Sequence, residues 1–133
     1  MTNPARPQRR RDRRPAELVR ARTAVYLTFF ANGVGFSNLV PRYPELVAHL
    51  GITKAAFGQA LMFVSVGALV AGLAASWLIN RLTSAKVASL GMVVLGAGLL
   101  VAGVSSSWIV LALAFAWVGG MDAVVDVAQN AHG

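Results

Sequence analysis

Four apolar segments, each long enough to cross a lipid bilayer, constrain this chain more than any other feature of its sequence. A helix needs roughly 20 mostly apolar residues to span a hydrocarbon core about 30 Å thick. Hydrophobic residues make up 56% of the 133 positions and charged residues only 13%, which is unusual for a water-facing protein. The sequence therefore predicts an all-α integral membrane protein. The expected transmembrane helices are about 23–40, 54–79, 87–104 and 108–130.

Short links separate these segments. Pro41 and Pro44 remove backbone donors and disfavour helix in the residues before them, so they end the first segment. A basic link over residues 80–86 joins the second segment to the third. Trp108 opens the fourth segment, and a Trp there suits a membrane interface, where the ring is buried and the indole N–H stays wet.

The N-terminal residues 1–21 are rich in arginine and proline and have few apolar side chains, so we expect a disordered basic tail before the membrane domain over residues 22–133. Eight Lys or Arg residues precede the first segment and two lie in the 80–86 link, against two after the first segment and none after the third. The positive-inside rule then places the tail and Gly133 in the cytoplasm, and the protein in the inner membrane of the cell.

Polar residues form a stripe on the fourth segment. At about 100° per residue, Asp122, Asp126, Gln129 and Asn130 fall within an arc roughly 100° wide. An acid at the centre of a bilayer costs roughly 2.5 to 3.5 kcal/mol, so the stripe should face other helices. Asp126, and after it Asp122, are candidates for binding a proton. Alternatively the stripe marks a wetted helix end, in which case Gln129, Asn130 and His132 are solvated.

The first segment carries two amides, Asn32 and Asn38, of which Asn32 shares a face with Thr28 and Gly35. A buried amide can hydrogen-bond the hydroxyl groups of a solute. It can equally bond a neighbouring helix, since interhelical amide bonds are frequent in membranes. Both interpretations stay open at this point.

Several functions have no support in the residues. The chain has no cysteine, which excludes disulfides and thiol chemistry. It has no glycine-rich phosphate loop, no nucleophile motif and no cluster with metal-ligand spacing, so we expect no enzyme activity, no cofactor and no metal. Aromatic residues for stacking bases are missing from residues 1–22, so the basic tail does not predict nucleic-acid binding.

The layout of close-set spans, with a basic link after the second and the run Asp126-Val127-Ala128-Gln129-Asn130-Ala131 closing the fourth, resembles the major facilitator superfamily. Within it, Asn32-Gly33-Val34-Gly35 leading to Pro41 is similar to the fucose-permease-like branch of sugar and proton symporters. The resemblance implies a proton-coupling role for Asp126. It also implies substrate contacts on the first and fourth helices, for which the candidates are Asn32, Asn38, Gln129 and Asn130. Asn38 stands where that branch has an acid.

The superfamily's signature after the second helix, Gly-x-x-x-Asp-Arg-x-Gly-Arg-Arg, maps onto residues 76–85. Only Arg81 matches, while Asn80 replaces the acid, both glycines are replaced, and Lys86 supplies the other nearby positive charge.

Such transporters resemble two six-helix halves that rock around a central substrate. We therefore expect four helices of the N-terminal half of a truncated transporter that moves a small polar solute with protons, and that is inactive without the remaining helices. Other interpretations are a drug or metabolite efflux transporter of the same superfamily, a small dimerising four-helix exporter, and a non-transporting scaffold whose tail binds anionic lipid.

Overall fold

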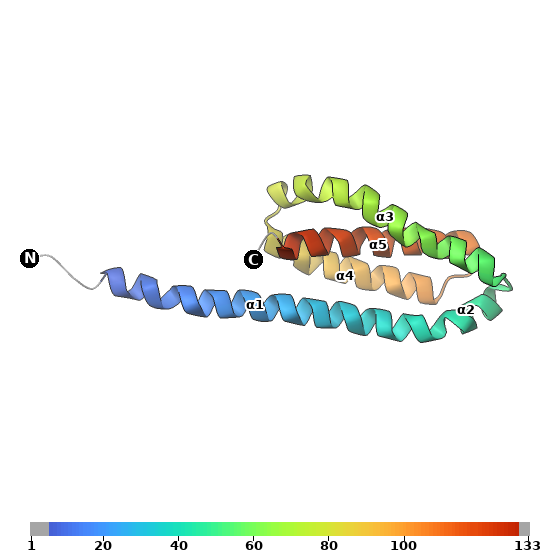
Figure 1. Cartoon of the computed structure of the whole chain (residues 1–133), viewed down its shortest axis with the longest axis horizontal. Coiled ribbons are helices and arrows are strands. Elements are labelled where there is room, and N and C mark those ends of the chain that lie inside the picture. Colours follow the sequence, from blue (N-terminus) through green and yellow to red (C-terminus); the bar gives the residue numbers. More distant parts are fainter. Residues whose placement is uncertain (1–5, 131–133) are drawn as a thin grey trace, which may run out of the picture.

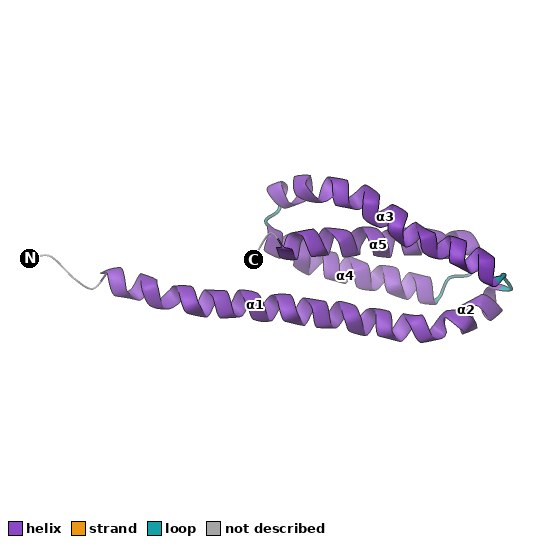
Figure 2. Cartoon of the chain, viewed as in Figure 1, coloured by secondary structure: helices purple, strands orange, loops and turns teal. Residues whose placement is uncertain are grey.

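The structure is a computed structural model that describes residues 6–130, with side chains from residue 16 onward. Every regular element of this part of the chain is helical (Figure 2). The elements are α1 (Arg6–Leu39), the 3-10 turn η1 (Val40–Arg42), α2 (Tyr43–Leu50), α3 (Lys54–Arg81), α4 (Ser84–Gly103) and α5 (Trp108–Asn130).

The four long helices lie side by side (Figure 1). α5 packs against both α3 and α4, and α1 packs against α4. The link between α3 and α4 and the last turn of α5 lie at one end of the bundle, which we call the Gln129 end; α2 lies at the opposite end, the α2 end. The N-terminal part of α1 extends beyond the other helices at the Gln129 end (Figure 1).

Three of the described helices, α3, α4 and α5, are long and apolar enough to cross a membrane. The first and last residues of these helices agree to within three residues with those of the apolar segments predicted from the sequence. α1 is the longest helix, at 34 residues, yet it is not among the three because polar side chains, including Asn32 and Asn38, interrupt its apolar half. The all-helical membrane fold is thus confirmed as three clear spans and a fourth, more polar helix.

The first helix begins earlier than the sequence predicted. Residues 6–21, expected to be a disordered tail, are helical and continuous with the apolar part of α1. Arg, Gln, Glu and Ala have high helix propensities, and adding residues to an existing helix avoids the cost of nucleation. Residues 1–5 lie outside the described residues.

The link after α1 also contains a helix that the sequence analysis missed. α2 is eight residues long and ends at Gly51, whose φ of 59° places it in the left-handed region that glycine tolerates. α3 then begins after Thr53, whose side chain accepts a hydrogen bond of 3.1 Å from the backbone N–H of Ala56. This capping turn sets the angle at which the chain enters α3.

Small residues bring α3 and α5 into backbone contact. A Cβ atom added to Gly67 would collide with the backbone carbonyl of Ala116, and one added to Gly119 would collide with that of Val64. A Cβ atom added to Gly120 would lie 3.2 Å from the Cβ of Ala71, so small residues line this interface over several turns.

The buried side chains form two clusters. The larger one lies towards the α2 end and includes Leu39, Phe57, Leu111 and Phe115. The smaller one lies towards the Gln129 end and is built on Ala75, Val87, Val124 and Ala128. The Gln129 end thus holds fewer and smaller buried side chains than the α2 end.

Candidate functional site

A hydrogen bond between α1 and α5 forms the centre of the candidate site. The side-chain amide of Asn32 donates from Nδ2 to Oδ1 of Asp122 over 2.6 Å, and the contact is partly buried. A hydrogen bond to a charged carboxylate contributes about 1.5 to 3 kcal/mol. The structure thus joins one candidate from each of the two polar segments, residues 90 positions apart in the sequence.

This contact uses the amide donor of Asn32 and leaves its side-chain oxygen without a partner among the described residues. Its Oδ1 is buried and accepts no hydrogen bond from any described residue. A buried acceptor without a donor is expensive, so such atoms usually await a ligand, a water molecule or a change of state. A solute hydroxyl, or the Asp122 carboxyl in its protonated form, has the donor that this oxygen lacks.

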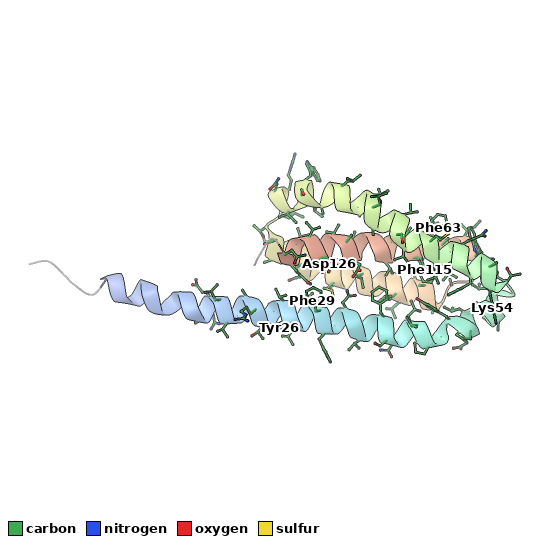
Figure 3. The ribbon with its side chains drawn as sticks, viewed as in Figure 1. Tyr26, Phe29, Lys54, Phe63, Phe115 and Asp126 are labelled. Atoms are coloured by element: carbon green, nitrogen blue, oxygen red, sulfur yellow. The ribbon has the colours of Figure 1, made fainter. Side chains whose placement is uncertain are left out.

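Asp126, which Figure 3 labels on α5, is four residues after Asp122, so the two acids lie on the same face of the helix. Its side chain is half-buried, and none of the described side chains donates a hydrogen bond to it. The two carboxyl groups therefore differ in their environment: Asp122 is held by an amide, while Asp126 has only its fellow acid as a charged neighbour on that face.

Gln129 and Asn130 end the stripe in different surroundings. Gln129 is only 5% exposed, and its Oε1 has no hydrogen-bond donor among the described residues. Asn130 is exposed at the last position of α5. Asn130 therefore faces the surroundings of the helix end, while Gln129 is enclosed by its neighbours. His132 lies outside the described residues.

Asn38 does not join this group. Its side chain is exposed and donates a hydrogen bond of 2.8 Å to the carbonyl of Val34 in its own helix. It lines a separate cavity of about 280 Å³ between α1 and α4 towards the α2 end, together with Arg42. Thr28, which was expected to share the face of Asn32, likewise bonds its own helix, at the carbonyl of Ala24.

The link that maps onto the family signature lies at the Gln129 end. Asn80, Arg81 and Lys86 are all exposed, and the Arg81 guanidinium lies 5.2 Å from the centre of the Trp77 ring. Thr83, which stands where the signature has its second glycine, adopts a φ of 57°. A β-branched side chain is strained in that region, which explains physically why the family uses glycine there.

Two contacts had no signal in the sequence. The indole N–H of Trp108, predicted to face water at an interface, donates instead to the carbonyl of Ala56 in α3 over 2.6 Å. Tyr43 packs its ring against Phe57 and Phe115, and burial raises the pKa of its hydroxyl above the ordinary value of 10.0.

The chemistry of the site is limited to hydrogen bonding and proton binding. Within residues 6–130, no three His, Cys, Asp or Glu side chains converge in a way that would hold a metal ion. What the structure brings together is an amide, two carboxyl groups and a buried glutamine, distributed along the contact between α1 and α5.

Comparison with known proteins agrees with this architecture. The model of the Major Facilitator Superfamily matches residues 25–131, which include the apolar part of α1 and the whole of α3, α4 and α5. No curated protein and no solved structure matches the chain. With a family match that covers most of its length, and with helices that are long and apolar enough to span a membrane, this chain belongs to the Major Facilitator Superfamily of membrane transporters.

Proposed function

We propose that this chain forms part of a secondary-active transporter that moves a small polar, sugar-like solute together with protons. The hydrogen bond between Asn32 and Asp122 carries the proposal, because it places an amide and an acid from two helices at one point inside the bundle. Intramembrane acids are rare, and they mark ion and substrate pathways. The resemblance to fucose-permease-like symporters supports the sugar-like solute.

The two acids have different parts in this proposal. Asp126, which no described side chain holds by a hydrogen bond, exchanges the coupled proton. Asp122 and Asn32 form the solute-facing pair, in which the free Oδ1 of Asn32 accepts from a solute hydroxyl. A change in the charge of Asp126 reaches this pair through space, since residues four apart on a helix are neighbours.

We propose that the complete transporter contains helices in addition to these four. Transporters built from two halves hold substrate between them, and these four helices supply surfaces for one half only. On α3, Met62, Leu69 and Leu73 are exposed, Leu73 at 81%. Lipid, or other helices of the transporter, cover such a face. We also propose an inner-membrane location with the start of α1 in the cytoplasm, on the basis of the positive-inside rule.

The coupling is tested by solute-driven proton entry into proteoliposomes that contain the complete transporter and an internal pH dye. A panel of pentoses and hexoses is added outside, and Asp126→Asn is compared with the wild type. We expect the substitution to abolish proton entry while solute counterflow, which needs no net proton movement, continues. Glu45→Gln is the matched control, because Glu45 is an exposed acid on α2.

Unchanged proton entry in Asp126→Asn would remove this residue from the coupling mechanism. Absence of both proton entry and counterflow for every sugar in the wild type would contradict the sugar-like solute.

A further inference from the structure

A cavity of about 120 Å³ lies at the Gln129 end, where α1 crosses α4 and α5. It is distinct from the contact between Asn32 and Asp122, since neither of those residues lines it. Thr28 of α1, Ser89 of α4 and Gln129 of α5 supply polar side chains to its wall. Ser84 also lines this space, so α4 contributes two oxygen-bearing side chains, and α1 and α5 contribute one each.

These oxygen atoms share one property, because all of them can accept a hydrogen bond. The hydroxyl of Thr28 already donates to the carbonyl of Ala24 over 2.7 Å, and that of Ser89 donates to the carbonyl of Ala85 over 3.0 Å. Gln129 is 5% exposed, and its Oε1 receives no hydrogen bond from any described residue. The unpaired Oε1 of Gln129 therefore calls for an occupant that donates a hydrogen bond.

We propose that this cavity is a water site and that it forms the inner end of a hydrated path along α1. Water is the smallest molecule that donates hydrogen bonds, and a space of about 120 Å³ is large enough to hold it. The unpaired oxygen of Gln129 and the hydroxyl oxygens of Thr28 and Ser89 give a water molecule the two to four polar partners that it needs. Filling it supplies a donor to Gln129, whose burial is otherwise unexplained.

A second and larger space continues the path outward. A groove of about 570 Å³ shares Ala21, Val25 and Gln129 with the cavity, and Arg22 and Asn130 form part of its wall. Gln129 thus lines both the larger groove at the end of the bundle and the smaller space beside Thr28. The path ends at Thr28, one helical turn before Asn32, which bonds Asp122.

The consequence for transport depends on the proposed function. If Asp126 exchanges the coupled proton, water at Thr28 brings the aqueous phase to within four residues of α1, or roughly 6 Å along its axis, of the Asn32 level.

Cysteine labelling in membranes tests the water site directly, because the chain contains no cysteine of its own. A thiol reacts with N-ethylmaleimide as the thiolate, which forms in water and not in lipid or in a dry protein interior. We expect Thr28→Cys to be labelled about 10-fold faster than Leu27→Cys, because only the former has access to water. Leu27 is the matched control: it is the adjacent residue of α1 at nearly the same depth, and its side chain is 62% exposed on the apolar surface.

A second substitution assigns the water to Gln129. In the Thr28→Cys background, Gln129→Leu removes the unpaired acceptor, and we expect labelling to fall to the rate of Leu27→Cys. Equal rates for Thr28→Cys and Leu27→Cys in the otherwise unaltered chain would overturn the water site. A rate unchanged by Gln129→Leu would overturn the role of Gln129.

These measurements do not depend on transport. Fast labelling at residue 28, combined with proton entry that Asp126→Asn leaves unchanged, would keep the water site and reject the coupling role of Asp126. Equal labelling at residues 28 and 27, combined with proton entry that Asp126→Asn abolishes, would reject the water site and keep the coupling role of Asp126.

Discussion

The helix α5 contacts its neighbours α3 and α1 in opposite ways. Towards α3 the contact is apolar and so close that Gly67 and Gly119 leave no space for a methyl group. Towards α1 the contact is polar, with the bond between Asn32 and Asp122 near its middle and cavities beside Gln129. One helix therefore has a face that is locked by packing and a face that is held by a few polar groups.

This difference indicates which of the contacts made by α5 can change their geometry. Backbone contacts between small residues have one favourable distance, and a shift of α3 against α5 would lose many van der Waals contacts at once. A polar contact with adjoining cavities can exchange one partner for another, such as a solute hydroxyl or a water molecule. We infer that α5 is held more rigidly against α3 than against α1.

The largest effect is expected at the close contact. Gly67→Val places a branched side chain against the backbone of Ala116, and the strain should lower the free energy of unfolding by about 3 kcal/mol or more. The apparent Tm in detergent and the yield of folded protein report the loss. Gly72→Val is the control, because a Cβ at Gly72 meets nothing within 4 Å. Similar losses in both variants would mean that α3 and α5 are not in backbone contact.

A smaller effect is expected at the polar contact. Asn32→Leu leaves Asp122 without its donor, and we expect a loss of about 2 kcal/mol in unfolding free energy. Combining it with Asp122→Leu removes both polar groups and should recover most of the loss. Asn38→Leu is the matched control, since the Asn38 side chain bonds only its own helix. If Asn32→Leu and Asn38→Leu behaved alike, the bond across the helices would contribute nothing.

A gain in stability is expected in the link between α3 and α4. Thr83 has a φ of 57°, which is strained for a residue with a Cβ atom. Thr83→Gly relieves this strain but also gives the unfolded chain more conformational freedom. We expect the free energy of unfolding to rise by about 1 kcal/mol in total. Thr83→Ala keeps the Cβ atom and should bring little gain, which makes it the control. Equal melting temperatures for Thr83→Gly and wild type would show that the link is unstrained.

The apolar pattern predicted the tightly packed helices well. Length and hydropathy alone define α3, α4 and α5 to within three residues, because a bilayer selects for long uninterrupted apolar runs. The same criterion fails for α1, whose charged N-terminal turns form a helix without being apolar. The resemblance to the superfamily is confirmed by the match over residues 25–131, while the sugar-symporter branch stays a prediction.

The candidate site was only partly predictable. Helical periodicity assigned Asp122, Asp126 and Gln129 to one face of α5, but an angle on one helix does not say which helix lies opposite. The pairing of Asp122 with Asn32 spans 90 residues and depends on how α1 packs, for which the sequence has no local signal. The burial of Gln129 has the same origin, since only the arrangement of three helices encloses its side chain.

The smallest effect is expected at the α2 end, where an aromatic cluster attaches the chain after α1 to the tightly packed pair. Burial raises the pKa of the Tyr43 hydroxyl above its ordinary value of 10.0, so the fold favours the neutral phenol. The stability gained this way is fully present below pH 10 and is lost as the pH rises through the higher pKa of the folded state. We expect the apparent Tm of the wild type to fall more steeply above pH 10 than that of Tyr43→Phe, which packs against Phe57 without a titrating group. Parallel pH profiles for the two proteins would show that ionisation of this hydroxyl does not loosen the attachment of α2, and that the α2 end is held by packing alone.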